Sequence, residues 1–220
     1  MRLITCLLLW LLVAMPVLAQ TVAEKNATDD AYPVPFASKD NAVELTVANP
    51  TGVPIGPIHI EAEEAPSWLL LEPEAVTLKS VAADSEAVAH FRFGLEKTAP
   101  VGVHMLRFAV RVGEEVVFKE IRLAVEAPRA VVLRPNYPNP FNPRTKLGYE
   151  LPVAGRVQLR VYDVLGREVV RLVSDEQKAG YHEAVWEAGR YASGWYLARL
   201  VVDGSEGRRT VKQQTMLLVK

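Results

Sequence analysis

The 220-residue chain contains one cysteine, Cys6, and four histidines. Cys6 falls inside an apolar run near the start of the sequence, so the chain beyond that run has no thiol. This excludes disulfides and thiolate chemistry for that part, whose stability must come from burial of apolar surface. The histidines show no HxH or HxxxH spacing, which predicts no metal site and no cofactor. They are His59, His90, His104 and His182.

Motifs of enzyme active sites are also missing. The sequence contains no Gly-x-Ser-x-Gly, no glycine-rich phosphate loop and no Ser, His and Asp arrangement at strand ends. The tightest carboxylate group is Glu61, Glu63 and Glu64, which could serve glycoside hydrolysis or bind calcium. We interpret these glutamates as solvated edge charges that discourage strand pairing. The sequence therefore predicts no catalytic residue and no enzyme, with a small hydrolase using Glu61 or Glu63 as the alternative.

The first nineteen residues have the pattern of a signal peptide. Arg2 supplies a positive start, an apolar run follows from Leu3 to Val13, and Val17-Leu18-Ala19 fits the cleavage pattern. The apolar run is shorter than the roughly 20 residues that span a bilayer. We therefore expect cleavage between Ala19 and Gln20, no transmembrane segment in the mature chain, and export through the periplasm to the cell surface or the medium.

The charges divide the chain into two regions. Residues 20–128 hold nine Lys and Arg against seventeen Asp and Glu, whereas residues 129–220 hold fifteen against nine. This shift, and the proline in Ala127-Pro128-Arg129, predict a domain boundary there. Arginines of the basic region are spaced singly over the predicted strands, which favours a solvated face and no nucleic-acid partner, although attraction to an anionic surface stays open. They are Arg156, Arg160, Arg167, Arg171 and Arg199.

Apolar and polar residues alternate through both regions, as in half-buried strands. In the first region this pattern gives about seven strands separated by turn clusters, which predicts an immunoglobulin-like β-sandwich over residues 41–127 behind a polar leader, residues 20–40. After a linker over residues 128–136, the second region reads as another small sandwich, residues 137–220, with tight hairpins at residues 163–167 and 203–207. The expected fold class is all-β, with two immunoglobulin-like domains in tandem.

The second region carries a set of motifs in a fixed order. Tyr137-Pro138-Asn139-Pro140-Phe141-Asn142-Pro143 opens it, Tyr162-Asp163 and Gly166-Arg167 flank a turn, Gly194 precedes Trp195-Tyr196, and Lys220 closes it. In order and spacing these motifs resemble the C-terminal sorting domain of type IX secretion cargo. The resemblance implies a β-sandwich recognised by an outer-membrane translocon, and in many members cut by a sortase-like protease that links the cargo to lipopolysaccharide.

Physical roles can be assigned to these residues independently. Pro138, Pro140 and Pro143 fix φ and remove amide donors, which predicts a stiff, extended strand leader that lets Tyr137 and Phe141 pin an apolar surface. Tyr162, Asp163, Gly166 and Arg167 are interpreted as hairpin chemistry rather than a binding site. Residues 216–220 are the best candidate for contact with the translocon.

Other interpretations remain open. Flagellar hook-capping proteins share the Asn-Pro-Phe-Asn-Pro and Tyr-Asp-x-x-Gly-Arg style of motif, which makes a scaffold domain one alternative. The first region loosely resembles bacterial sandwich modules that trail surface proteins, through Pro66-Ser67-Trp68 and Ala99-Pro100-Val101-Gly102. It is therefore expected to be a non-enzymatic cargo domain, or else a carbohydrate- or protein-binding adhesin.

Overall fold

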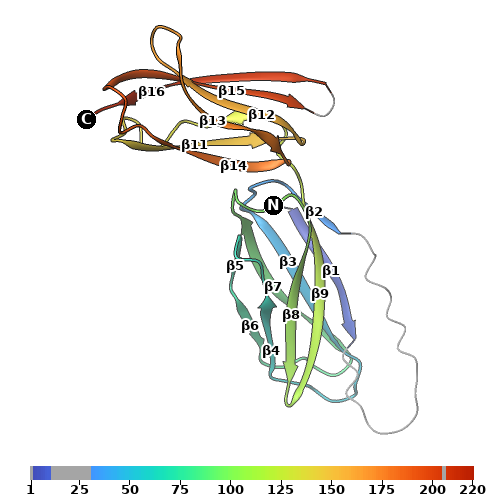
Figure 1. The fold of residues 1–220 in the computed structure, drawn as a ribbon. Helices are drawn as coiled ribbons and strands as arrows, with labels where there is room; N and C mark the ends of the chain where they lie inside the picture. The colour runs from blue at the N-terminus through green and yellow to red at the C-terminus, as the bar shows by residue number, and fades with distance from the viewer. Residues whose placement is uncertain (1, 11–30, 205–206) are drawn as a thin grey trace. The chain divides into compact units, whose positions relative to one another are not determined.

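The computed structural model describes residues 2–10, 31–204 and 207–220, so the expected cleavage pair Ala19 and Gln20 lies outside the described residues. The all-β prediction is confirmed, because every regular element among the described residues is a strand. Within that part of the chain there is consequently no helix long and apolar enough to cross a bilayer. The chain divides into two compact units, residues 1–126 and 127–220, called unit 1 and unit 2 below (Figure 1).

Unit 1 consists of two sheets that share one apolar core. One has the strand order β1-β3-β7-β5 and the other β2-β9-β8-β4-β6 (Figure 1). The seven strands expected from the sequence correspond to β3 through β9. The bounds are β1 Arg2–Trp10, β2 Tyr32–Val34, β3 Asn41–Asn49, β4 Ile58–Glu64, β5 Leu69–Glu72, β6 Ala75–Leu78, β7 Ser85–Leu95, β8 Gly102–Val112 and β9 Glu115–Val125.

The core of unit 1 is made by apolar residues at every second position of the strands, which face the space between its sheets. Val43 of β3 and Phe91 of β7 are fully buried from one side, and Ile60 and Phe108 from the other. The rings of Phe91 and Phe108 meet across the core with centroids 4.8 Å apart. Each such side chain contributes about 1.5–3 kcal/mol by leaving water, which is how a chain without disulfides holds this fold together.

Two strands of unit 1 lie outside the span expected for the domain. β2 falls in the expected polar leader, yet Val34 is 1 % exposed and its carbonyl accepts a hydrogen bond from the amide of Glu126 at 2.9 Å. The apolar run expected to be a leader separate from the domain contributes β1, which pairs parallel with β3 from Arg2 opposite Asn41 to Trp10 opposite Ala48. Backbone pairing of an open sheet edge needs only an extended segment, so an apolar leader can fill that position.

Unit 2 also has two sheets, with orders β10-β11-β14 and β13-β12-β15-β16 (Figure 1). β10 lies in the segment expected to be a linker. β14 was not predicted, because its core-facing positions are Gly180, His182, Ala184 and Trp186, which give no apolar alternation. The bounds are β10 Val132–Leu133, β11 Arg144–Leu151, β12 Gly155–Tyr162, β13 Glu168–Gln177, β14 Gly180–Glu187, β15 Gly194–Gly204 and β16 Arg209–Leu218.

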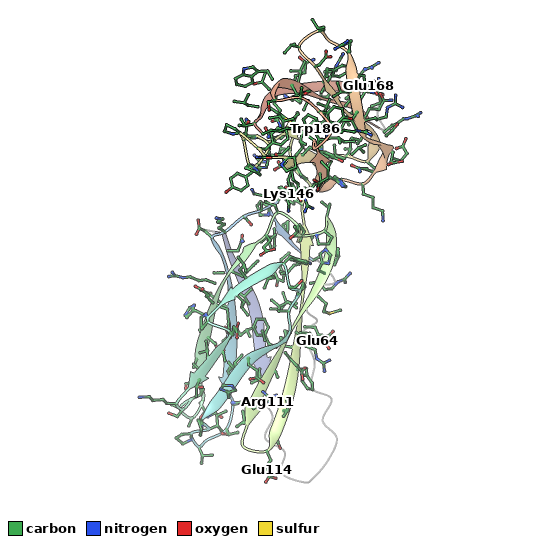
Figure 2. All side chains as sticks on the ribbon, turned by 60° about the vertical axis from the view of Figure 1, so that its left-hand side comes forward. Glu64, Arg111, Glu114, Lys146, Glu168 and Trp186 are labelled. Carbon is green, nitrogen blue, oxygen red and sulfur yellow. The ribbon has the colours of Figure 1, made fainter. Side chains whose placement is uncertain are left out.

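Trp186 is the centre of the core of unit 2 (Figure 2). Its side chain is 1 % exposed, and its ring centroid lies 5.3 Å from that of Phe141 and 5.0 Å from that of Tyr196. Tyr149, also fully buried, stacks on His182 at 5.5 Å, and burial raises the pKa of its phenol to about 12. Phe141, from the proline-rich motif, therefore belongs to the central aromatic cluster of the unit.

Candidate functional site

Phe141 connects the proline-rich motif to β16, the strand that runs from Arg209 to Leu218. Its side chain is 2 % exposed. Its amide donates to the carbonyl of Leu217 at 3.0 Å, and its carbonyl accepts from the amide of Val219 at 2.9 Å, forming a parallel bridge opposite Leu218. The prediction that Phe141 pins an apolar surface is confirmed, and the structure identifies the strand that it holds.

A second bond from the same motif reinforces this contact. The side-chain Oδ1 of Asn139 accepts a hydrogen bond from the amide of Leu217 at 3.0 Å, across 78 positions of sequence. Asn139 and Phe141, with Leu217, Leu218 and Val219, are called the β16 latch below. Because β16 is the edge strand of its sheet, these bonds satisfy backbone groups of β16 that β15 does not reach.

A buried polar cluster fixes the start of the motif. Asn136 is 3 % exposed, and its side-chain amide donates to the carbonyl of Pro138 at 3.0 Å and to Oγ1 of Thr145 at 2.9 Å. The hydroxyl of Thr145 donates to the same Pro138 carbonyl at 2.8 Å. A backbone bridge between Tyr137 and Lys146 completes the cluster. The motif is therefore anchored to β11 at its start and to β16 at Phe141.

Two expectations for the motif are wrong. Tyr137 does not pin an apolar surface, because its side chain is 80 % exposed. The segment is also not an extended leader: residues 138–140 form bends, and the Tyr137-Pro138 and Asn139-Pro140 peptide bonds are cis. Asn142 and Pro143 are likewise exposed, although the Pro143 carbonyl accepts from the amide of Ala188 at 2.8 Å. The motif thus presents an exposed surface on both sides of a buried phenylalanine.

The turn between β12 and β13 is built by Asp163, as the hairpin interpretation predicts. Its Oδ1 accepts from the amides of Leu165 and Arg167 at 2.9 and 3.0 Å, and its Oδ2 accepts from Nε of Arg167 at 2.7 Å. These bonds, led by the amide of Arg167, lower the pKa of the carboxyl. Gly166 has φ of 78°, a conformation that favours glycine. Val164 and Leu165 at the tip are 76 % and 73 % exposed.

The remaining residues of the second region's motifs gather at one end of the four-stranded sheet. Tyr162 lies opposite Leu197, and Gly194 lies opposite Leu218. Gly194 has φ of 148°, which also favours glycine. The amide of Lys220 donates to Oγ of Ser193 at 3.1 Å, and its Nζ donates to the carbonyl of Gly189 at 2.8 Å. The structure thus brings Tyr162, Gly194 and Lys220 to the end of the sheet that the latch closes.

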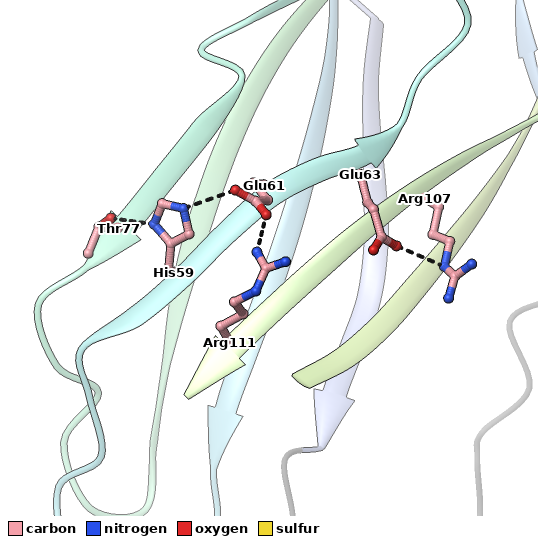
Figure 3. Close-up of polar contacts among 6 residues, drawn as sticks. All are labelled: His59, Glu61, Glu63, Thr77, Arg107 and Arg111. Atoms are coloured by element: carbon pink, nitrogen blue, oxygen red, sulfur yellow. Dashed lines mark hydrogen bonds and ion pairs between the residues drawn. The ribbon is translucent and has the colours of Figure 1, made fainter. Parts of the chain in front are cut away.

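The glutamates of β4 form a polar array on the outer face of unit 1 (Figure 3). Glu61 pairs with Arg111, and its other oxygen lies 3.3 Å from Nε2 of His59. The hydrogen bond from Arg111 is the largest cause of the lowered pKa of Glu61. Glu63 lies 3.4 Å from Nε of Arg107. The edge-charge interpretation is wrong for Glu61, because β4 lies between β8 and β6 and Glu61 is paired on both sides.

The same array places a hydroxyl, an imidazole and a carboxylate in a chain. Nδ1 of His59 lies 3.0 Å from Oγ1 of Thr77, on the side of the ring away from Glu61 (Figure 3). The side chains of His59 and Glu61 are 43 % and 35 % exposed. Water therefore competes for each bond, and the array lacks the desolvated setting in which such groups drive acyl transfer. Among the described residues, no group of three His, Cys, Asp or Glu could hold a metal ion.

The expectation that the arginines of the basic region lie apart is wrong for three of them. Arg160 of β12 stands directly opposite Arg171 of β13 and directly opposite Arg199 of β15. Periodicity places each arginine on a solvent face but does not give the register between strands, which sets their neighbours. Trp195, on β15, is 54 % exposed.

Comparison with known proteins identifies no family. No family model matches the chain, and no curated protein matches it. The chain is similar in structure to dimeric latent PorU from Porphyromonas gingivalis, at 18 % identity and TM-score 0.34, covering 88 % of this chain and 19 % of that one. It is also similar to the CupB2 chaperone of Pseudomonas aeruginosa, at 14 % identity and TM-score 0.29, covering 84 % and 96 %. A third similar structure is the E. coli chaperone DraB, at 18 % identity and TM-score 0.29, covering 86 % of this chain and 94 % of that one.

Proposed function

We propose that the chain is an exported, non-enzymatic protein in which unit 2 is a type IX sorting domain and unit 1 is a small immunoglobulin-like cargo domain. Residues 1–19 are then removed as a signal peptide, which takes β1 away and leaves β2 through β9. The partners are the outer-membrane translocon and a sortase-like protease, with lipopolysaccharide as the attachment point after processing.

The β16 latch is the observation that supports this function most. Residues that the resemblance singles out, at opposite ends of the region, are joined by backbone and side-chain bonds into one folded unit. The motif also leaves Tyr137 at 80 % exposure, where it contributes little to the core. A sorting signal of this form is a surface that exists only in the folded domain, made by the exposed side chains of the motif and by β16.

An export assay in a host with type IX secretion tests the proposal. Residues 129–220 are fused behind a signal peptide and a reporter, and the reporter is followed in periplasm, on cells and in medium. We expect export of the fusion and loss of export when residues 216–220 are deleted, because the latch then has no strand to hold. A reporter that stays in the periplasm with the intact tail contradicts the proposal.

Tyr137→Ala separates recognition from folding in the same assay. The side chain is 80 % exposed, so its loss should leave the unit folded and resistant to protease. Reduced export of this variant, with unchanged protease resistance, indicates direct contact with the translocon. Val164→Ala, which truncates a side chain of 76 % exposure at the tip of the β12–β13 turn and outside the latch, serves as a matched surface change.

A protein-binding adhesin is the second candidate, because unit 1 exposes large apolar side chains on the β8–β9 hairpin. Val103, Met105 and Phe118 are 55 %, 50 % and 44 % exposed. A sugar platform is less well supported, since the guanidinium of Arg107 covers the Phe118 ring at 3.9 Å. Glycan-array binding by the secreted protein would favour the carbohydrate form, and a pure cargo domain should bind no glycan.

A further inference from the structure

Three arginines form a row across the outer face of the four-stranded sheet of unit 2. Arg160 is the middle member, and the register places Arg171 on one side of it and Arg199 on the other. Arg160 and Arg199 face each other in a regular antiparallel ladder, where Cβ atoms lie about 4.5–5.5 Å apart and like charges are destabilising. The pairing of Arg160 with Arg171 lies at a register shift between Leu159 and Arg160. This arginine row therefore costs stability in the protein alone.

The protein compensates only part of this charge. Glu168 lies between two members of the row, 3.2 Å from Nη1 of Arg160 and 3.4 Å from Nη2 of Arg171. Gln158 accepts from Nη2 of Arg160 at 2.6 Å. Arg199 has no hydrogen bond or ion pair to any described residue, and its buried Nε has no partner. One carboxylate thus pairs with two of the three guanidinium groups, and the excess positive charge lies toward Arg199.

Arg199 lies across from Arg160 and Gln213 on the neighbouring strands, but the side chains before and after it on its own face of β15 are apolar. Trp195, Leu197 and Val201 lie on the same face of β15, because side chains two apart on a strand point the same way. Trp195 is 54 % exposed, and Val211, opposite Val201 on β16, is 41 % exposed. Exposed tryptophan beside aliphatic and cationic side chains is typical of surfaces that lie at the headgroup level of a membrane.

We propose that this face binds an anionic lipid surface, with the arginine row on the headgroup phosphates and Trp195 at the boundary with the acyl chains. Guanidinium groups suit this ligand because their planar fork binds phosphate through two hydrogen bonds. Phosphates carry the negative charge that the row lacks. The proposal goes beyond the sorting role and holds whether or not unit 2 is a secretion signal.

Sedimentation of the full chain with vesicles tests the proposal. We expect binding to phosphatidylglycerol vesicles that falls with added salt, and little binding to phosphatidylcholine vesicles. Each basic residue near a charged bilayer contributes about 1 kcal/mol, so Arg199→Gln and Arg171→Gln should each weaken binding about fivefold. Arg144→Gln removes the same charge from β11, in the other sheet, where Arg144 pairs with Glu187 at 3.0 Å. It should change binding less than twofold.

Glu168→Gln distinguishes lost contacts from a folding defect. It removes the carboxylate that pairs with the row and should strengthen vesicle binding, a gain that misfolding would not produce. All variants share the apolar N-terminal segment, so differences between them report on the row alone. Equal losses in Arg199→Gln and Arg144→Gln overturn the proposal. The proposal is also overturned if inorganic phosphate, at the same concentration as the lipid phosphate, abolishes vesicle binding. That result indicates a site for the free anion. Tighter binding to a DNA duplex than to vesicles also overturns it.

Discussion

The outer face of β4 and β8 in unit 1 and the outer face of β12, β13 and β15 in unit 2 both carry charged side chains, but they arrange them differently. In unit 1 the charges alternate, so that Glu61 meets Arg111 and Glu63 meets Arg107 (Figure 3). In unit 2 arginine faces arginine, and Arg199 is left without a partner among the described residues. A face whose positive and negative side chains pair with one another suits a spacer domain, whereas a face with excess positive charge suits the binding of an anionic ligand.

The units also differ in how they hold their outlying segments. Unit 1 holds β2 by a short backbone ladder to β9. Unit 2 holds β16 with a segment that is not a strand, through the amide and ring of Phe141 and the side chain of Asn139. Single substitutions in the proline-rich motif of unit 2 can therefore remove its structural role, which makes the comparison between the two units testable.

Phe141→Ala should produce the largest effect. It removes a ring that is 2 % exposed and touches Trp186, so the free energy of unfolding of unit 2 should fall by about 3–5 kcal/mol. Unit 1 should keep its stability. Denaturant unfolding followed by tryptophan fluorescence, with hydrogen exchange to assign each transition, measures both. Tyr137→Ala is the control, with an expected change below about 0.5 kcal/mol; equal losses in the two units would contradict the latch.

Asn139→Ala should have a smaller effect, confined to the latch. The amide of Leu217 loses its acceptor, and the net loss of one such bond is about 0.5–1.5 kcal/mol. Hydrogen exchange at Leu217 should accelerate while exchange in the middle of β15 stays unchanged. Unaltered protection of Leu217 would show that the side chain of Asn139 does not hold β16.

Arg199→Glu should raise the stability of unit 2, by about 0.2–1 kcal/mol, because it places opposite charges across from each other in the row. The matched reversal in unit 1, Arg111→Glu, should lower stability, since Glu61 would then face a like charge. Thermal unfolding at low salt measures both variants. Destabilisation by both would remove the distinction between the two faces.

Acid should loosen the β12–β13 turn. The folded state lowers the pKa of Asp163 below its ordinary 3.8, so the carboxylate stabilises the turn above that pH and the contribution is lost as pH falls through the folded pKa. Amide shifts of Leu165 and Arg167 should titrate together below pH 3.8. Asp163→Ala should abolish this titration at every pH, while Glu168→Gln should leave it in place.

Much of the fold could be predicted from the sequence, because the inner parts of β3, β7, β8 and β9 place a buried apolar residue at every second position. β14 could not, since its buried face is made of glycine, histidine and alanine before Trp186. β1 could not either, because its apolar run has the composition of a leader and nothing in it specifies pairing with β3. Periodicity assigns a residue to a face; it does not say which strand lies beside it.

Some features of the candidate site could likewise be predicted from the sequence, and others could not. The Asp163 turn could be predicted, since Asp163 and Gly166, three positions apart, are residue types with local roles in a turn. The partner of Phe141 could not, because Leu217 comes much later in the chain and no local pattern links the two. The arginine row depends on register, and a slip of one residue would turn its members to opposite faces.

The latch also sets the order in which unit 2 can be completed during synthesis. Asn139 leaves the ribosome 78 positions before Leu217, whose amide donates to it. The β16 latch therefore cannot form until the final strand has been made. A polypeptide truncated before β16 lacks Leu217 and Val219, the backbone partners of Phe141, so the proline-rich motif is then anchored at its β11 end alone.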